Sequence, residues 1–463
     1  MGGFHNFFKN TIIFTISNFS SKILVFLLLP LYTRTMSSNE LGDSDLIITL
    51  VSFVFPILSL CVSEGVLRFG NNKQLDSKQV FSIGMYIILI GFAILLFCFK
   101  IVSIFVSEYL LFFYTIYLFS AFSQYFNQFL RSKDQIMLIG VTGVISTIIV
   151  VVCNIIFLCI YNLGANGYLL SYTLMYIFSS LILFFKGNLY KYISKMKLSF
   201  DVFIPLMKYN LPLIPNKTNW WLISVLNRYV LRFMCGASSA GIYIAASKIP
   251  TIINTVYSIV QQALLLSVID IYDSTNENSF YSNISSIMAM ILEVLVLVIS
   301  LCMCLLSNFL FGTSYDYAWK ICPLLILSAY FGSLHGNLAT EYLAKKETQT
   351  LFANSCLGAI ASLILNVILI YLLDINGAVI SAFLTYLIVW FHLYMKSKYR
   401  MSYKHYLLFL LLTIQSGSSL FLNKYLFFSL SLLFILIFFV VYFDDIKKIL
   451  VIILKYLNIK KIL

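Results

Sequence analysis

The chain has 463 residues, of which 61% are hydrophobic and only 11% are charged, and its mean hydropathy is +0.94. This composition excludes an ordinary soluble globular domain and predicts an all-α polytopic membrane protein. A net charge of +13 would favour a nucleic-acid partner for a soluble protein, but in a membrane protein the charges must first be sorted by topology. We therefore expect no nucleic-acid partner.

Fourteen apolar segments are long enough to cross a bilayer core, which requires about 20 residues per helix. Because residues 1–10 lead directly into the first segment without a small-residue cleavage site, we expect no signal peptide. Short turns containing Asn and Gly separate several of the segments. The predicted spans are 11–31, 44–66, 80–101, 106–126, 138–161, 166–185, 211–233, 241–265, 286–307, 319–338, 351–372, 376–396, 404–422 and 425–443.

Basic residues fix the expected orientation of these spans. If the amino terminus and the even-numbered loops lie on one side, 22 of the 31 lysines and arginines are there, and five are on the other side. The positive-inside rule then predicts that both termini are cytoplasmic. Residues 444–463 carry aliphatic side chains at helical spacing beside lysines, which predicts an amphipathic helix on the inner leaflet.

The chain also contains signs of an internal duplication. A Lys, an Arg, a Gly and a mid-helix Pro recur in the same order, 194 or 195 residues apart. These pairs are Lys22 and Lys217, Arg34 and Arg228, Gly42 and Gly236, and Pro56 and Pro250.

Two copies of six spans enter the membrane with the same polarity, so the repeat axis should follow the bilayer normal, as expected for alternating access by two lobes. The prolines should bend their helices, because each removes a backbone hydrogen bond. We predict a lobe of six spans at 1–190, a cytoplasmic linker at 191–210, a second lobe at 211–400, two further spans at 401–443 and the terminal amphipathic helix at 444–463.

Cations inside the predicted spans are the main functional signal. A fixed positive charge in hydrocarbon costs at least about 2.5 kcal/mol, so such residues usually face a bundle interior or an aqueous cavity. Arg suits phosphate oxygens because its guanidinium donates hydrogen bonds in pairs. The alternative is a buried ion pair, with Glu64 or Glu293 as a partner of the first lysine. The predicted substrate-binding residues are Lys22, Arg34, Lys217, Arg228 and Lys248.

Carboxylates, histidines and cysteines give weaker signals. Glu64, one turn before Arg68, and Glu293 are candidates for an ion pair or for coupling to H⁺ or Na⁺. Four histidines and nine cysteines show no metal-ligand or disulfide spacing, so we expect no metal site, no other cofactor and no catalytic residues.

Several short motifs resemble one known family. Residues 212–221 (PLIPNKTNWW), Asn227-Arg228-Tyr229, 240–243 (AGIY) and 247–250 (SKIP) resemble the central signature of Wzx-type polysaccharide repeat-unit flippases, the exporters of O-antigen and capsule units. Residues 30–34 (PLYTR) and 41–42 (LG) resemble that family's first hairpin. The layout of six, six and two spans is similar to that of the multidrug/oligosaccharidyl-lipid/polysaccharide exporter superfamily.

The resemblance implies a flippase of a bacterial cytoplasmic membrane that moves undecaprenyl-diphosphate-linked oligosaccharide from the inner to the outer leaflet. It also implies that Lys22, Glu64, Arg228 and Lys248 line a central cavity, and that a polysaccharide polymerase and a chain-length regulator are partners. This chain has Asn227 where the family often has Asp, which argues against an ion pair or a proton role at that position.

Three other functions make different demands on the sequence. A drug or metabolite antiporter of the same fold would require buried carboxylates for a cationic cargo, and the predicted interior charge has the opposite sign. A lipid II flippase is compatible with the cation pattern. A membrane enzyme would require a large outer loop with acid and base residues, whereas the longest predicted outer loops have about a dozen residues.

Overall fold

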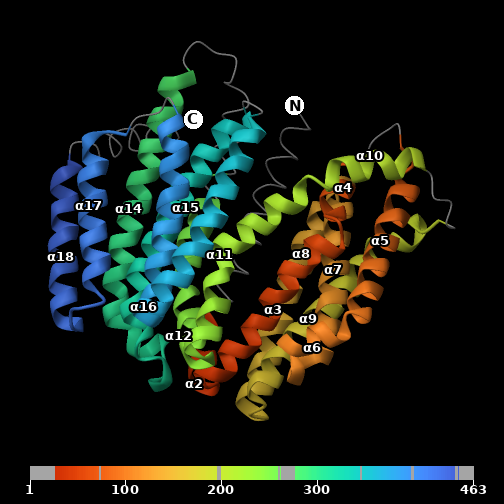
Figure 1. Ribbon diagram of the computed structural model, residues 1–463, viewed down its shortest axis with the longest axis horizontal. Helices are drawn as coiled ribbons and strands as arrows, with labels where there is room; N and C mark the ends of the chain where they lie inside the picture. Colours follow the sequence, from red (N-terminus) through yellow and green to blue (C-terminus); the bar gives the residue numbers. More distant parts are fainter. Residues whose placement is uncertain are drawn as a thin grey trace, which may run out of the picture. The chain divides into compact units, whose positions relative to one another are not determined.

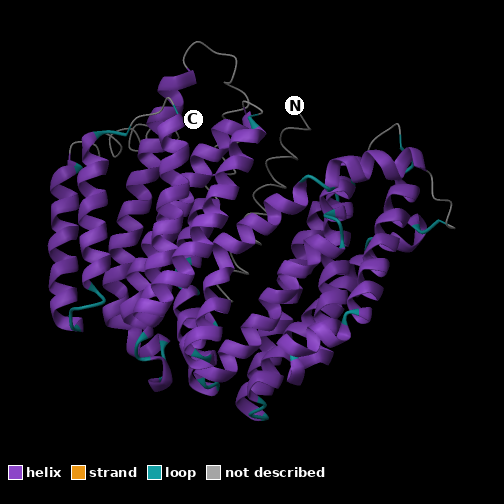
Figure 2. Ribbon diagram, in the orientation of Figure 1, coloured by secondary structure: helices purple, strands orange, loops and turns teal. Residues whose placement is uncertain are grey.

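The computed structural model describes residues 27–71, 75–194, 200–258, 261, 277–344, 347–397, 401–443 and 447. Within these residues the chain is helical and contains no β-strand (Figure 1 and Figure 2). The predicted all-α class is therefore confirmed. Lys22 and nearly all of the predicted terminal helix at 444–463 lie outside the described residues.

Eight helices of the described chain are long and apolar enough to cross a membrane. The longest contains two predicted spans, because α16 (Thr348–Lys396) comprises two helical segments that meet at Asp374, whose φ of 50° and ψ of −129° are not helical. The chain is thus a multi-pass membrane protein. The eight segments are Ser38–Leu58, Ser77–Phe97, Ile136–Ile160, Gly164–Lys186, Ser285–Leu310, Ala318–Leu343, Thr348–Lys396 and Lys424–Val441.

The chain divides into two compact units. Unit 1 comprises residues 1–248, 310–315 and 355–381, and unit 2 comprises 249–309, 316–354 and 382–463. This division follows contacts rather than sequence similarity, so the predicted boundaries of the repeated lobes stay a prediction.

Unit 1 contains most of the shorter and interrupted helices. Figure 1 shows α3, α4, α7 and α9 as neighbouring helices, with α12 against the first part of α3. Its helices are α2 (Leu29–Thr35), α3 (Ser38–Leu58), α4 (Val62–Phe69), α5 (Ser77–Phe97), α6 (Phe99–Phe105), α7 (Leu110–Ser132), α8 (Ile136–Asn154), α9 (Gly164–Lys186), α10 (Phe200–Asn210), α11 (Leu213–Cys235) and α12 (Ala237–Ser247), with short 3₁₀ turns at Ser107–Tyr109, Leu189–Tyr192 and Thr313–Tyr315 and a π-helical turn at Ile155–Ile160.

Unit 2 is built from long helices that run side by side. They are α14 (Glu277–Leu310), α15 (Ala318–Ala344), the two ends of α16 at 348–354 and 382–396, α17 (Tyr403–Ser418) and α18 (Lys424–Val441), whereas 355–381 of α16 belong to unit 1 (Figure 1). Polar side chains join neighbouring helices, as where Asn337 of α15 donates to Ser285 of α14 at 2.9 Å and Gln415 of α17 donates to Ser431 of α18 at 2.9 Å. Such buried hydrogen bonds hold helices together where the surrounding lipid provides no hydrophobic driving force.

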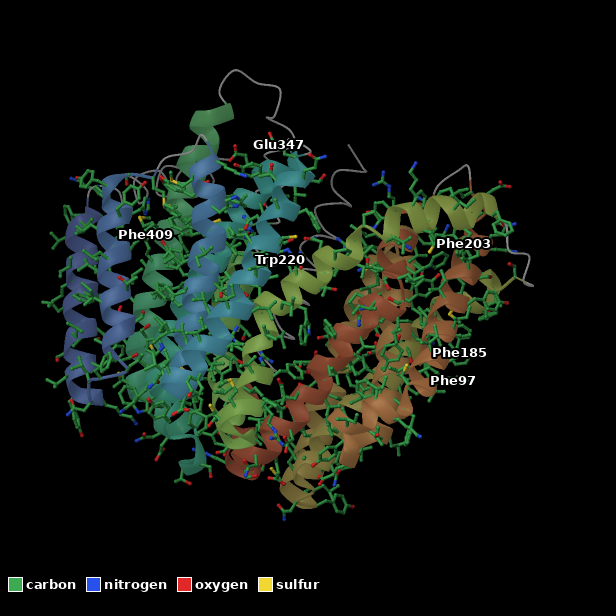
Figure 3. All side chains as sticks on the ribbon, in the orientation of Figure 1. Phe97, Phe185, Phe203, Trp220, Glu347 and Phe409 are labelled. Atoms are coloured by element: carbon green, nitrogen blue, oxygen red, sulfur yellow. The ribbon has the colours of Figure 1, made fainter. Side chains whose placement is uncertain are left out.

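Large apolar side chains cover the outside of the helices. In unit 1, Phe97 is 95% exposed and Phe185 is 61% exposed, and both point away from the neighbouring helices (Figure 3). Exposed Phe residues at this density are unfavourable in water and are expected on a surface that faces lipid tails.

The two predicted helix bends lie beside their prolines. Helix α3 includes Pro56 and ends at Leu58, and the chain then turns through Leu60 and Cys61, both with a φ near 50°, before α4 begins. Helix α12 ends at Ser247, the turn that follows at 248–250 includes Pro250, and the chain is helical again over 251–258. The predicted spans 44–66 and 241–265 are therefore interrupted helices.

Helices α3 and α12 make the closest backbone contact of unit 1 that involves glycine. A Cβ on Gly42 would lie 2.4 Å from the Ala237 carbonyl oxygen, and a Cβ on Gly241 would lie 1.8 Å from the Ser38 carbonyl oxygen. Because 42 and 241, and likewise 38 and 237, are each 199 residues apart, the contact is reciprocal, as a local two-fold axis requires. This contact pairs Gly42 with Gly241, whereas the sequence spacing pairs it with Gly236, and the internal duplication itself stays a prediction.

Candidate functional site

Asp45 binds two of the predicted cations at once. Its Oδ2 accepts a hydrogen bond from Arg228 Nη1 at 2.8 Å, and its Oδ1 accepts one from Lys248 Nζ at 2.8 Å. The side chains of Asp45, Arg228 and Lys248 are 5%, 17% and 21% exposed. We call these three residues the Asp45 cluster; all of them lie in unit 1.

Three helices position the cluster. Helix α3 begins at Ser38, where Ser37 and Glu40 form a capping box, so Asp45 lies about two turns inside the helix. Arg228 projects from α11, and Lys248 ends α12 in a helical conformation. Since the glycine contact brings α3 and α12 together, the Asp45 carboxylate and the Lys248 ammonium meet near the same crossing.

Neighbouring polar groups make further hydrogen bonds with Asp45 and Arg228. The Tyr168 hydroxyl donates to Asp45 Oδ1 at 3.4 Å, and Arg228 Nη2 donates to Ser247 Oγ at 3.4 Å. The Nε–H of Arg228 is buried and has no hydrogen-bond partner among the described residues. Because an unpaired buried donor of a charged group is costly, the guanidinium has the capacity to bind a further acceptor.

The Asp45 cluster carries one positive charge in excess when all three groups are ionised. One carboxylate cannot neutralise both an arginine and a lysine, and partial burial weakens screening by water. A cluster of this kind attracts a further anion. Phosphate oxygens match the geometry of a guanidinium and an ammonium side by side.

The remaining predicted cations of unit 1 lie in more exposed places. Lys217 pairs with Glu64 at 2.7 Å, with side-chain exposures of 51% and 31%, so the partner of Glu64 is Lys217 and not the nearby Arg68. Arg34 is exposed in the last turn of α2. The structure therefore unites two of the five predicted binding residues, Arg228 and Lys248, and leaves Lys217 and Arg34 elsewhere.

Glu293 lies in unit 2 and belongs to a separate buried network. It is completely buried, and its Oε1 lies 2.9 Å from Nδ1 of His405, which is 2% exposed. Tyr330 donates to Oε1 at 3.1 Å, and Tyr442 donates to Oε2 at 3.1 Å and lies 2.7 Å from His405 Nδ1. The network joins α14, α15 and α17 to the residue that follows α18.

Sequence reasoning missed the two partners that organise these sites. Asp45 was overlooked because the predicted span began at residue 44, whereas α3 begins six residues earlier and places Asp45 inside the helix. The capping pattern Ser37-x-x-Glu40 was the available signal. His405 was not selected as a candidate, although it lies at the start of the predicted span 404–422.

Metal-ligating side chains do not gather in the part of the chain that the structure describes. No group of three or more His, Cys, Asp or Glu residues is close enough there to hold a metal ion. That the whole protein requires no cofactor stays a prediction.

The comparison with protein families decides the identity. A family described as polysaccharide biosynthesis protein matches residues 7–266, more than half of the chain. The chain belongs to this polysaccharide biosynthesis protein family. The match covers Asp45, Arg228 and Lys248, so the cluster lies in the part of the chain on which family membership rests.

Solved structures show which fold this polysaccharide biosynthesis protein has. The lipid II flippase MurJ in an inward closed conformation is similar with a TM-score of 0.71 and 17% sequence identity, over 94% of this chain and 100% of that one. An inward-facing multidrug resistance MATE family transporter of the MOP superfamily is similar with a TM-score of 0.64 and 12% identity, over 81% and 94% of the two chains.

A third similar structure is a MATE transporter named ClbM in complex with Rb⁺, with a TM-score of 0.53 and 13% identity, over 86% of this chain and 96% of that one. No curated protein sequence matches the chain. At these identities the likeness establishes the fold alone, which is the fold of the MurJ and MATE structures.

Proposed function

We propose that the protein is a flippase that moves undecaprenyl-diphosphate-linked oligosaccharide repeat units from the inner to the outer leaflet of a bacterial cytoplasmic membrane. Membership of the polysaccharide biosynthesis family and the transporter fold support this proposal, and neither favours an enzyme. In this proposal both termini are cytoplasmic, and a polysaccharide polymerase and a chain-length regulator act after translocation.

The single observation that supports an anionic cargo best is the Asp45 cluster. Its excess positive charge and the buried Nε–H of Arg228 leave capacity for acceptor oxygens. We propose that a diphosphate takes the place of the Asp45 carboxylate at Arg228 and Lys248. Because the two anions compete for the same donors, the cations remain partly neutralised before the cargo arrives and after it leaves.

Release of the cargo follows from the same competition. As the diphosphate moves away, the Asp45 carboxylate regains both hydrogen bonds, so the empty cluster does not expose two unpaired charges to a low-dielectric environment. An inside-negative membrane potential favours outward movement of an anion by about 2.3 kcal/mol per charge for each 100 mV.

Coupling to an ion is a further part of this proposal. The Glu293–His405 pair can hold one proton on either partner, and the hydroxyls of Tyr330 and Tyr442 can stabilise the carboxylate. We propose H⁺ as the coupling ion and Na⁺ as the alternative, because a lone carboxylate beside a histidine suits a proton better than a metal ion. If so, Glu293→Gln abolishes the effect of a pH gradient on transport.

A lipid II flippase is the second candidate. The similarity to MurJ favours it, and its cargo, like the first, carries a diphosphate. A drug antiporter with a cationic cargo is disfavoured, because the Asp45 cluster has an excess of cations.

The test is transport by the full-length protein in proteoliposomes. A fluorescent undecaprenyl-diphosphate oligosaccharide is incorporated, and its appearance in the outer leaflet is measured by its accessibility to an added glycosidase. We expect Arg228→Ala and Lys248→Ala to lower the rate at least about tenfold, since each removes a charge-assisted hydrogen bond.

The matched control is Arg232→Ala, one turn along α11, because Arg232 also pairs with an aspartate, Asp43 at 2.6 Å, but is 44% exposed. Equal rates in the wild type and in both cluster variants would refute the role of the cluster. Transport of lipid II with no transport of any oligosaccharide carrier would favour the second candidate.

A further inference from the structure

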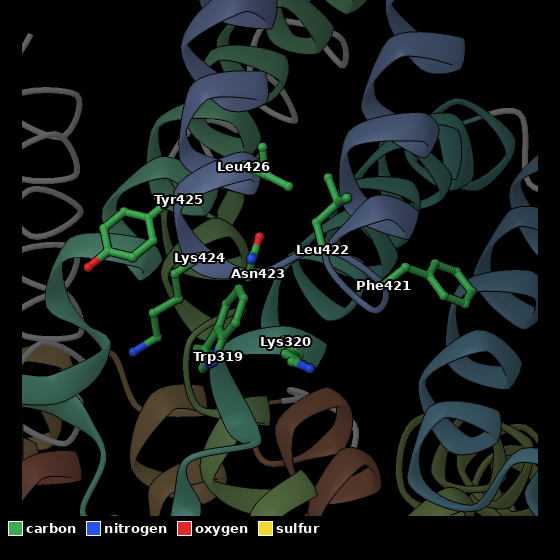
Figure 4. A pocket seen from close by; sticks show the side chains of 8 residues that line it. All are labelled: Trp319, Lys320, Phe421, Leu422, Asn423, Lys424, Tyr425 and Leu426. Atoms are coloured by element: carbon green, nitrogen blue, oxygen red, sulfur yellow. The ribbon is translucent and has the colours of Figure 1, made fainter.

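Unit 2 contains a hollow of about 600 Å³ at the start of α18. It lies between the first turn of α15 and the turn that joins α17 to α18 (Figure 4). We call it the α18 pocket. It is lined by Trp319, Lys320, Phe421, Leu422, Asn423, Lys424, Tyr425 and Leu426.

Two lysines give this pocket an unbalanced positive charge. Lys424 Nζ donates to the Asn308 amide oxygen at 2.7 Å and lies 5.6 Å from the centre of the Trp319 ring, and Lys320 Nζ lies 5.6 Å from the Tyr317 ring. Neither lysine pairs with a carboxylate of the described chain. In Figure 4 the Trp319 side chain lies between the two lysines.

The positions of the two lysines make their positive charges unfavourable. Lys320 and Lys424 each lie in the first turn of a helix, α15 and α18, and neither first turn contains an acidic residue. The helix dipole disfavours a cation at this end of a helix, and here two cations share one pocket. An anion bound in the pocket would relieve the repulsion.

The apolar lining indicates that this anion belongs to a lipid. Phe421, Tyr425 and Leu426 are 87%, 88% and 56% exposed, and α18 continues from the pocket as an apolar helix that can span the membrane. Aromatic side chains at the end of such a helix lie at the level of the head groups. A lipid phosphate at the lysines would thus place its acyl chains along the apolar surface of α18.

We infer that the α18 pocket binds the phosphate head group of an anionic membrane lipid, with Lys320 and Lys424 as ligands of the phosphate and Trp319 as part of the pocket wall. The bound lipid holds the α17–α18 turn against the start of α15. This site is separate from the Asp45 cluster and does not depend on the cargo of the transporter.

Native mass spectrometry of the purified full-length protein tests the inference. Dioleoyl phosphatidylglycerol and dioleoyl phosphatidylcholine are titrated in parallel, since they share acyl chains and differ in net charge. We expect phosphatidylglycerol to bind at least about tenfold more tightly to the wild type, and the Lys320→Gln/Lys424→Gln variant to lose this preference.

The control variant is Lys396→Gln, which removes an exposed lysine at the end of α16, outside the pocket, and should keep the preference. The Lys320→Arg/Lys424→Arg variant should also keep it, because charge is retained. Equal binding of the two lipids by the wild type, or an unchanged preference in the glutamine variant at an unchanged melting temperature, would overturn the inference.

Two further titrations identify the source of the phosphate. Undecaprenyl phosphate that displaces phosphatidylglycerol from the wild type but not from the glutamine variant would assign the pocket to a polyprenyl phosphate as well as to bulk lipid. Inorganic phosphate should not compete at millimolar concentration, and equal competition by inorganic phosphate would refute a lipid site.

Discussion

Asp45 and Arg228 are 183 residues apart in the sequence and 2.8 Å apart in the structure. The bond joins α3 to α11, and Lys248 adds α12 through the other carboxylate oxygen. One carboxylate therefore links three helices.

Asp45→Asn should destabilise the protein and increase its affinity for anions. Two partly buried cations lose their shared counterion, and breaking a buried ion pair typically costs about 3–5 kcal/mol. We expect a lower melting temperature that pyrophosphate restores in part, with a larger increase in the variant than in the wild type. An increase of the same size in both proteins would show that pyrophosphate does not bind at Arg228 and Lys248.

The crossing of α3 and α12 should not tolerate a side chain at Gly241. A Cβ there would lie 1.8 Å from the Ser38 carbonyl oxygen, so Gly241→Val requires the two helix backbones to separate. We expect little folded protein, measured as the monodisperse fraction after detergent extraction. Gly143→Ala is the control, because no atom lies within 4 Å of a Cβ at that position, and a normal yield of Gly241→Val would contradict the close crossing.

The exposed ion pair of Lys217 and Glu64 should contribute little to stability. Both side chains are more than 30% exposed, and surface pairs are typically worth about 0–1 kcal/mol. In a double-mutant cycle of Lys217→Gln and Glu64→Gln, followed by thermal melting, we expect shifts of at most a few degrees and a small coupling energy. A coupling as large as that between Asp45 and Arg228 would indicate that the pair is buried in the membrane.

Breaking the buried pair of Glu293 and His405 should, by contrast, destabilise the protein strongly. His405→Leu leaves a buried carboxylate with only tyrosine donors, so it should destabilise more than the double variant Glu293→Leu/His405→Leu, in which no charge remains. Thermal melting of the single and double variants measures this difference.

The control for that comparison is Gln415→Leu, which breaks the uncharged hydrogen bond to Ser431 between α17 and α18. It should cost about 1–3 kcal/mol at most, because the group left unpaired is neutral. A double variant that is less stable than His405→Leu would refute an ion pair as the main contribution of Glu293.

The sequence predicted the membrane class, the approximate positions of several spans and two residues of the Asp45 cluster. It did so because apolar segments of about 20 residues have few structural alternatives, and because a cation within such a segment requires a partner. Arg228 and Lys248 were found in this way. Their partner was not, because Asp45 lies close to the predicted helix end, where boundaries shift by several residues.

The predicted internal repeat also shows what sequence spacing can and cannot predict. Recurring Lys, Arg, Gly and Pro residues indicated a duplication with an offset of 194, whereas the reciprocal contact of Gly42 and Gly241 has an offset of 199. Sequence spacing cannot distinguish Gly236, a turn residue with a φ of 90°, from Gly241, which allows two backbones to touch.

What the sequence determined by itself is a chain of apolar helices with cations at depth, since hydropathy and charge are local properties. Only the tertiary structure decided which carboxylate meets which cation. It joined Asp45 to Arg228 and Lys248, Glu64 to Lys217, and Glu293 to His405. The physical reason is that such pairings depend on how helices far apart in the sequence cross, and those crossings are set by close packing at small residues rather than by the charged residues themselves.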